Sequence, residues 1–205
     1  MTDKSTIYLV DDDAGVLTAL SRLLRWKGYE VKPYSSPQVF LREHDANAPG
    51  CAVLDVSMPG LDGLEIQRVL TATAGYQRPV VFVTGQGDIP TSVRAMKAGA
   101  IDFLTKPIND DDLFEAVARA EARDAESRRF HSELRLIQAK VSTLTPRERE
   151  VFTHVVAGRL NKQIAGDLGT VEKTIKVHRS RMMEKLGVRT VADLVRMAEK
   201  LNLPK

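Results

Sequence analysis

Residues 6–107 alternate short apolar runs with amphipathic segments, and this alternation limits the possible folds more than any other feature of the chain. Strands that alternate with helices favour a parallel sheet, because right-handed crossovers place the helices on its two faces. The pattern therefore predicts an α/β fold with a five-stranded doubly wound parallel sheet. The five runs are TIYLV, EVKPY, CAVL, PVVFVT and AIDFLT.

Polar residues directly follow four of the five predicted strands. Asp11 and Asp12 follow the first, Asp55 the third, Thr84 the fourth and Lys106 the fifth. Ligands bind at the carboxyl ends of strands in such sheets, so we expect these side chains to meet at one edge. The alternative is a buried salt-bridge cluster, but such clusters contribute little to stability.

Carboxylates that gather at one edge repel one another unless a cation lies among them. Oxygen ligands without His or Cys predict Mg²⁺, with Mn²⁺ as the substitute. A carboxylate placed between this cation and an ammonium group can attack phosphorus, because both positive charges offset the charge of a phosphoryl group. Asp55 is the predicted nucleophile, with Lys106 as the ammonium and Thr84 as a hydrogen-bond partner of the phosphoryl group.

The segments VDDD, LDVSMPGLDG, VTGQG and FLTKP resemble the signature segments of the receiver domain of two-component response regulators, which has a flavodoxin-like fold. We place this domain at residues 1–122. The resemblance implies that Asp55 is the phosphoacceptor, and that a sensor histidine kinase is the donor. It also implies that Asp12 binds the metal directly and Asp11 through water, with the backbone carbonyl of Ser57 as a further ligand.

The same resemblance assigns roles to the end of the predicted sheet. Lys106 pairs with the phosphate, and the peptide bond from Lys106 to Pro107 is expected to be cis. Thr84 and Phe103 are the expected switch pair. The face formed by the fourth helix, fifth strand and fifth helix is expected to change on phosphorylation, and the protein is expected to form a homodimer on a two-fold DNA site.

A long helix is predicted to begin near Asp110 and to continue through a linker at residues 123–141, because Asp111 to Lys140 contains no Gly or Pro. Its last part shows heptad spacing, which allows docking on its own domains or pairing with a second chain. A partly frayed tether is a further alternative. The residues with heptad spacing are Phe130, Leu134, Ile137, Val141 and Leu144.

The charges of the chain are unevenly distributed. Residues 1–124 carry 13 Lys and Arg against 18 Asp and Glu, whereas residues 125–205 carry 17 against 9. The basic C-terminal part therefore predicts a polyanionic partner. Its helix signals begin with a capping box from Thr145 to Glu148 and continue with a short helix, a turn with Gly169 and a longer basic helix. That order indicates a helix-turn-helix.

LTPREREV and NKQIAGDLGTVEKTIKVHRSRMMEKLGV resemble the LuxR-type helix-turn-helix of the NarL/FixJ class, a four-helix all-α domain that we place at residues 142–205. The resemblance implies that Lys176, Val177 and Ser180 contact bases. It also implies pairing through the last helix, 191–201. TGQGD and the long linker resemble regulators of nitrogen fixation and of styrene catabolism. The residues expected to hold DNA phosphates are Lys173, Thr174, Arg179 and Arg181.

These features together predict a phosphorylation-activated transcription regulator that binds promoter DNA as a dimer and acts with RNA polymerase. A phosphohydrolase that forms an aspartyl phosphate is one rival, but haloacid-type enzymes have a second Asp where this chain has Ser57. A constitutive DNA-binding protein with an interaction-only receiver is the other. No external substrate is expected, although the chain could dephosphorylate itself.

No apolar run approaches the roughly 20 residues that span a membrane, and the acidic N-terminus does not resemble a signal peptide. We therefore expect a cytoplasmic protein without a membrane partner. The single cysteine, Cys51, is expected to be a small buried hydrophobe, and Trp26 is expected in the core.

Overall fold

The computed structural model describes residues 5–72, 77–85 and 87–201. Gln86 of the VTGQG segment therefore lies outside the described residues. The chain divides into two compact units, residues 1–129 and 130–205, and each is described by itself.

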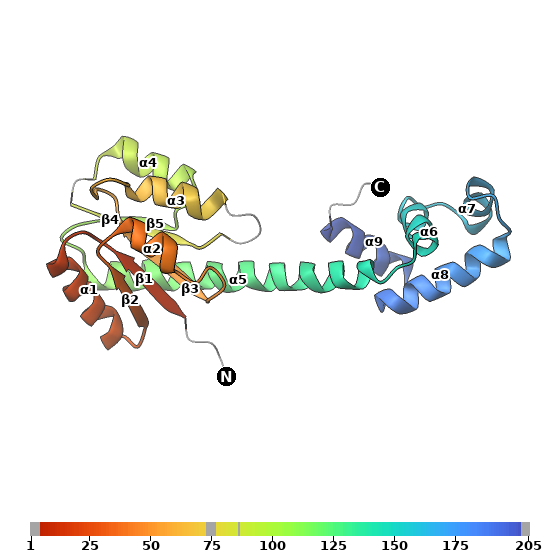
Figure 1. Ribbon diagram of the computed structural model, residues 1–205, viewed down its shortest axis with the longest axis horizontal. Helices are drawn as coiled ribbons and strands as arrows, with labels where there is room; N and C mark the ends of the chain where they lie inside the picture. Colours follow the sequence, from red (N-terminus) through yellow and green to blue (C-terminus); the bar gives the residue numbers. More distant parts are fainter. Residues whose placement is uncertain (1–4, 73–76, 86, 202–205) are drawn as a thin grey trace. The chain divides into compact units, whose positions relative to one another are not determined.

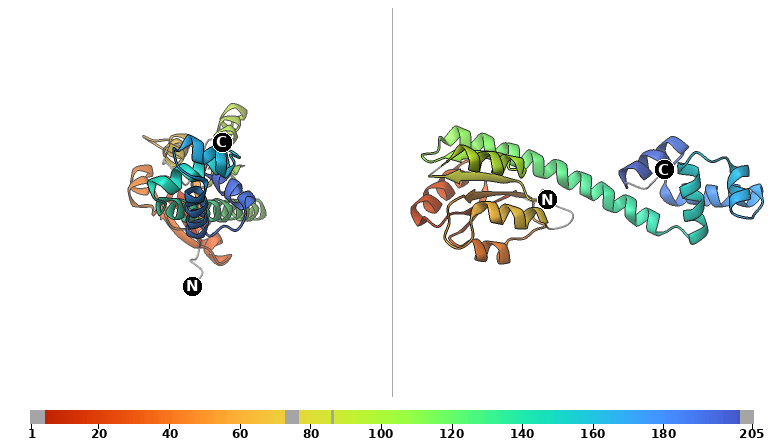
Figure 2. Two further views of the ribbon diagram at one scale, coloured as in Figure 1. Left: turned by 90° about the vertical axis from the view of Figure 1, so that its right-hand side faces the viewer. Right: turned by 90° about the horizontal axis from the view of Figure 1, so that it is seen from above.

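The first unit contains a five-stranded parallel sheet with the strand order β2-β1-β3-β4-β5. Its helices lie on both faces of the sheet (Figures 1 and 2). The predicted doubly wound α/β fold is therefore confirmed. The strands are β1 (Thr6–Val10), β2 (Glu30–Tyr34), β3 (Gly50–Asp55), β4 (Val80–Thr84) and β5 (Asp102–Thr105).

Alternate residues of each strand pack against different helices, because successive side chains point to opposite faces. Ile7 and Leu9 belong to a core with α1 and α5 (Asp110–Ser142), whereas Tyr8 and Val10 belong to a core with α2, α3 and α4. The first four helices are α1 (Ala14–Trp26), α2 (Pro37–Glu43), α3 (Gly63–Ala72) and α4 (Ile89–Lys97).

Cys51 is completely buried, as expected, and burial raises the pKa of its thiol. The prediction for Trp26 is wrong, because its side chain is 79% exposed. Trp26 is the last residue of α1, and the core side of that helix is already formed by residues such as Leu17, Leu20 and Leu24.

Helix α5 (Asp110–Ser142) is continuous over 33 residues, as the absence of Gly and Pro predicted. Arg128 holds it against the loop before β3, where Nη1 donates to the carbonyl of Asn47 and Nη2 to that of Ala48. Asp124 accepts hydrogen bonds from Gly50 N and Arg128 Nε, each at 2.9 Å. Burial raises the pKa of Asp124 although both hydrogen bonds oppose the shift.

The second unit begins with the last turns of α5. Ile137 and Leu144 are buried, and Val141 and Leu144 pack in one core with residues of the following helices. This part of the heptad pattern therefore docks within its own unit, whereas the Phe130 side chain is 50% exposed. The following helices are α6 (Pro146–Val156), α7 (Asn161–Asp167), α8 (Glu172–Leu186) and α9 (Val191–Lys200).

A capping box starts α6, as predicted, with Thr145 at the N-cap and Glu148 three residues later. Glu148 is buried and also accepts a hydrogen bond from Lys185 Nζ of α8 at 2.6 Å. The Lys185 ammonium and the Thr145 backbone N–H lower the pKa of Glu148. One carboxylate thus fixes both the start of α6 and its position against α8.

Among the described residues, no helix is long and apolar enough to cross a membrane.

Candidate functional site

Three of the predicted rim residues form direct contacts at the carboxyl ends of their strands. Asp11 follows β1, Asp55 is the last residue of β3, and Lys106 follows β5. Lys106 Nζ donates to Asp11 Oδ2 at 2.7 Å and to Asp55 Oδ1 at 2.8 Å. Both carboxylates are almost fully buried. The fold therefore joins residues 95 positions apart into one charged cluster.

The Lys106 ammonium is held in its charged form by this cluster. Partial burial would lower the pKa of Lys106, but its hydrogen bonds to Asp11 and Asp55 outweigh burial and raise the pKa above its ordinary value. One positive charge faces two buried carboxylates. The cluster therefore has an excess of negative charge, which favours an additional cation.

The remaining oxygens of the two carboxylates accept backbone hydrogen bonds. Asp11 Oδ1 accepts from Asp13 N at 2.9 Å, and Asp55 Oδ2 accepts from Ser57 N at 2.6 Å. Asp13 itself caps α1, because its Oδ1 accepts from the N–H groups of Gly15 and Val16. This cap was not predicted, although an Asp before a helical pattern is a capping signal.

Asp12, a predicted metal ligand, is exposed, whereas Asp11 and Asp55 are buried. Within the described ranges, no three His, Cys, Asp or Glu side chains converge closely enough to hold a metal ion. The donor set nevertheless fits Mg²⁺ in kind, since buried carboxylate oxygens are the ligands that this cation prefers. The excess negative charge of Asp11 and Asp55 beside one ammonium fits it as well.

Thr84 and Phe103 lie on the neighbouring strands β4 and β5. Thr84 is completely buried, and its backbone carbonyl accepts a hydrogen bond from Lys106 N at 2.7 Å. Phe103 is partly buried and packs on Phe82 with ring centroids 6.2 Å apart. The peptide bond between Lys106 and Pro107 is cis, as expected. The backbone thus connects Thr84 directly to the residue that holds both carboxylates.

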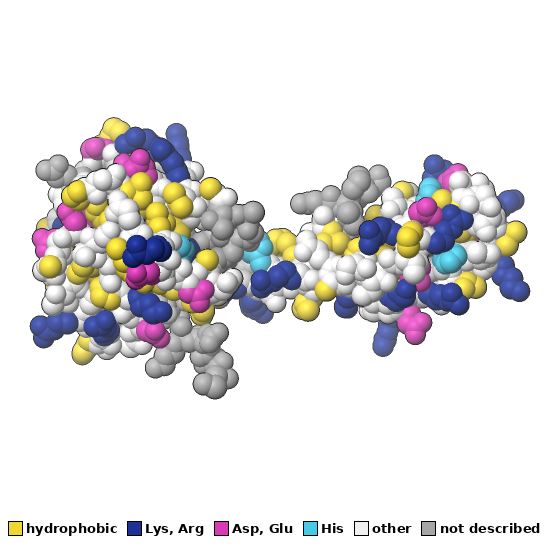
Figure 3. Space-filling view, in the orientation of Figure 1, with side chains coloured by type: hydrophobic (Ala, Val, Ile, Leu, Met, Phe, Trp, Pro, Cys, Tyr) yellow, Lys and Arg dark blue, Asp and Glu magenta, His cyan; other side chains and the backbone are white. Residues whose placement is uncertain are grey.

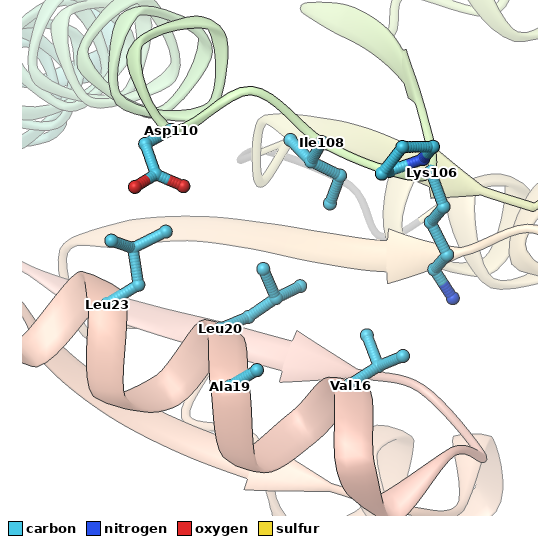
Figure 4. A pocket seen from close by; sticks show the side chains of 8 residues that line it. Val16, Ala19, Leu20, Leu23, Lys106, Ile108 and Asp110 are labelled. Atoms are coloured by element: carbon cyan, nitrogen blue, oxygen red, sulfur yellow. The ribbon is translucent and has the colours of Figure 1, made fainter.

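A groove of about 450 Å³ adjoins Lys106. One wall is formed by α1 and the other by the segment between β5 and α5, with the α1 side chains directed towards Ile108 and Asp110 (Figure 4). Most of its lining is apolar. The residues of α1 that line it are Val16, Ala19, Leu20 and Leu23.

Helix α4 presents an apolar stripe to solvent. Ile89, Val93 and Met96 are spaced by four and three residues, so they share one side of the helix. Their side chains are 79%, 43% and 46% exposed. Three neighbouring exposed apolar side chains on one helix are a candidate interaction surface.

Helix α8 has a packed side and an exposed side. Ile175, Met182 and Leu186 are buried in the core of the second unit. Of the predicted DNA contacts, Thr174 and Arg179 are half-buried, and the other five are exposed. Lys and Arg side chains are prominent on the visible surface of this unit (Figure 3). The exposed five are Lys173, Lys176, Val177, Ser180 and Arg181.

Two of the predicted cationic DNA contacts on α8 have side-chain partners within the second unit. Lys176 Nζ lies 3.1 Å from Glu172 Oε1, one helical turn away. Arg179 Nη1 donates to Asn161 Oδ1 of α7 at 2.9 Å. The role of Asn161 could not be predicted from the sequence, because a contact across 18 residues depends on how α7 and α8 pack.

Family models match both parts of the chain. The response regulator receiver domain matches residues 7–118, and the luxR family of bacterial regulatory proteins matches residues 142–198. The first match contains the cluster of Asp11, Asp55 and Lys106, and the second contains α6 to α8. The fold and both sites therefore define a response regulator with a LuxR-type DNA-binding domain.

Similar proteins share this arrangement over nearly the whole chain. The response regulator protein TmoT of Ectopseudomonas mendocina is 45% identical, over 97% of this chain and 90% of its own length. The transcriptional regulatory protein FixJ of Bradyrhizobium diazoefficiens is 38% identical, over 97% of this chain and 96% of its own length. The solved structure of the response regulator StyR is 44% identical in sequence, with a TM-score of 0.83. The match covers 96% of this chain and 99% of the StyR chain.

The chain belongs to the two-component response regulators, in the group that joins a receiver domain to a LuxR-type domain. Its function is DNA-binding transcription regulation, and activation by phosphorylation is typical of the family. Family members act on no external substrate, which excludes the phosphohydrolase alternative. Receiver domains of this family bind Mg²⁺ at the phosphorylation site, and their phosphate comes from a sensor kinase.

Proposed function

We propose that Asp55 is the phosphoacceptor of this regulator, with Lys106 as the phosphate-pairing cation. The supporting observation is the Lys106 ammonium, which bonds to both Asp11 and Asp55 at the strand ends. A carboxylate oxygen of Asp55 forms a bond to phosphorus as the bond from phosphorus to the histidine nitrogen of the kinase breaks. Lys106 then offsets the charge on the transferred phosphoryl group.

Asp11, Asp12 and Asp55 would hold Mg²⁺ or Mn²⁺, together with the backbone carbonyl of Ser57. The cation supplies positive charge to the phosphoryl oxygens. Of the three carboxylates, Asp12 is the exposed one, so it is accessible to a cation at the edge of the sheet.

The switch in this proposal is the pair Thr84 and Phe103. Phosphorylation adds a charge of about −2 at Asp55, which recruits Lys106 and the Thr84 hydroxyl. Because the Thr84 carbonyl is bonded to Lys106 N, a displacement of either residue is transmitted to β5. Phe103 responds on β5, the strand that contacts α4.

The stripe of Ile89, Val93 and Met96 is the surface through which two phosphorylated copies pair. Dimerisation would cover these exposed apolar side chains, which stabilises the pair by removing them from water. The groove beside Lys106 is the proposed docking surface of the kinase, since a donor helix on Leu20 and Leu23 would lie next to the rim that carries Asp55.

The second unit carries the output of the regulator. Lys176, Val177 and Ser180 would contact base edges, because they lie on the exposed side of α8. The proposed target is promoter DNA with two-fold symmetry, on which two copies also pair through α9. The bound dimer would recruit RNA polymerase in the cytoplasm. The phosphate contacts are Lys173, Thr174, Arg179 and Arg181.

The proposed domains are a receiver at 1–122, a linker at 123–141 and a DNA-binding domain at 142–205. The contacts of Asp124 and Arg128 with the first unit, and of Ile137 with the second, suggest that each end of the linker is part of the neighbouring unit.

Phosphate incorporation tests the proposal. We expect the protein to gain one phosphoryl group from acetyl phosphate in the presence of Mg²⁺, as measured by intact mass. Asp55→Asn should gain none, whereas the capping variant Asp13→Asn should still be modified. Incorporation into Asp55→Asn would refute the assignment.

A further inference from the structure

Asn161 and Arg179 connect the two helices of the helix-turn-helix. Asn161 is the first residue of α7, and Arg179 lies in the middle of α8. Arg179 Nη1 donates to Asn161 Oδ1 at 2.9 Å, and both residues are half-buried. This hydrogen bond is a tertiary contact that restricts the guanidinium to one location beside α7.

Arg179 lies at the edge of the packed side of α8. Ile175 is four residues before it and Met182 three residues after it, so both lie on the same side of the helix. Both are completely buried. Arg179 itself is half-buried, a common state for long cationic side chains, whose aliphatic stems can cover apolar surface.

The partner of Arg179 orders its guanidinium without neutralising it. A neutral amide oxygen uses one of the five N–H donors and leaves the positive charge uncompensated. Throughout the described ranges, no carboxylate forms an ion pair with Arg179. Lys176 differs, because Glu172 lies 3.1 Å from its ammonium and must be released before Lys176 pairs with DNA.

We propose that Asn161 is a positioning residue that fixes Arg179 for contact with a DNA phosphate. The planar fork of an arginine matches phosphate oxygens. A fork that is already ordered loses less side-chain freedom on binding, so the affinity is higher. The proposal rests on the DNA-binding role proposed for Arg179, and it makes Asn161 part of that site without direct contact to bases.

The test uses the full-length protein and a short fluorescent DNA duplex of mixed sequence, since a phosphate contact requires no particular operator. Affinity is measured at several salt concentrations for the wild type, Asn161→Ala, Asn161→Asp, Arg179→Ala and the double alanine variant. Thermal melting of each variant shows whether it is folded.

The two changes at Asn161 have different expected effects. Asn161→Ala should weaken binding about three- to tenfold, because order is lost, with an unchanged salt slope. Asn161→Asp retains a partner but neutralises the guanidinium, so the slope should fall by about one, as in Arg179→Ala. The double variant should bind like Arg179→Ala alone.

Unchanged DNA affinity in Asn161→Ala would overturn the inference. It would also be overturned if Asn161→Ala lowered the affinity of the Arg179→Ala variant as much as it lowers that of the wild type. A purely structural role would lower the melting temperature but would not give different salt slopes for alanine and aspartate. Failure of the wild type itself to bind the duplex would instead refute the DNA-binding proposal on which the inference rests.

Discussion

The charged groups of the two units differ in burial and in the number of partners that they share. In the first unit, Lys106 bonds to two buried carboxylates, and each residue of the cluster depends on the others. In the second unit, the cations of α8 are mostly exposed, and Lys176 and Arg179 have separate partners. Changes in the buried cluster should therefore act together, whereas changes on the exposed helix should act nearly independently.

The largest effect should come from Lys106→Ala, which leaves Asp11 and Asp55 buried without their cation. We expect phosphorylation by acetyl phosphate to slow about 100-fold or more, because a positive charge at the reacting group is lost. The rate of mass gain measures this effect. Lys32→Ala, at an exposed lysine of β2, is the control, and an equal rate in both variants would break the comparison.

Ile89→Glu should weaken phosphorylation-dependent dimerisation about tenfold or more, since a buried unpaired charge opposes association. Trp26→Glu is the matched control, because Trp26 and Ile89 are each 79% exposed. Sedimentation with and without phosphodonor measures the dimer. A greater loss in Trp26→Glu would move the interface from α4 to α1.

On α8, Lys176→Ala should relax preference at one base position and cost about 1–3 kcal/mol there. Arg181→Ala should weaken binding to all sequences and lower the salt slope by about one. Competition with a set of single-base variants of a selected duplex separates the two. Similar profiles for both changes would show that the exposed cations are not independent base and phosphate contacts.

The smallest effect concerns Glu148, a buried carboxylate of the second unit that binds the Lys185 ammonium. The pKa of Glu148 is lower in the folded state than in the unfolded state, where it is about 4.3. The charged carboxylate therefore stabilises the fold above the unfolded-state pKa, and this stabilisation is lost as pH falls through the folded-state pKa. Glu148→Gln should therefore melt at a lower temperature than the wild type near neutral pH. That difference should shrink in acid, and a constant difference would exclude the charged form as its cause.

The rim was predictable because parallel strands fix which ends meet. Asp11, Asp55 and Lys106 are each placed by a strand end, so a correct strand pattern is enough to bring them together. Asp12 also follows β1, but its side chain is exposed, because a position next to a strand end does not determine burial.

Contacts that depend on loops or on helix packing could not be predicted. Arg128 donates to the carbonyls of Asn47 and Ala48, a contact that depends on the path of the loop before β3. Arg179 donates to Asn161, a contact that depends on how α7 packs against α8. Trp26 was misplaced because helical spacing alone does not determine how far the core covers the last turn of α1. The two arginine contacts join residues far apart in the sequence, and Trp26 lies at a helix end, so no local sequence pattern indicates where these side chains lie.

The central claim is that the covalent state of Asp55 in the first unit controls DNA binding by the second. The affinity of the full-length protein for a selected duplex, measured with Mg²⁺ before and after treatment with acetyl phosphate, tests it most directly. We expect tighter binding after treatment in the wild type and no change in Asp55→Asn. Equal affinity of the wild type before and after phosphorylation would contradict the account and favour a constitutive DNA-binding protein.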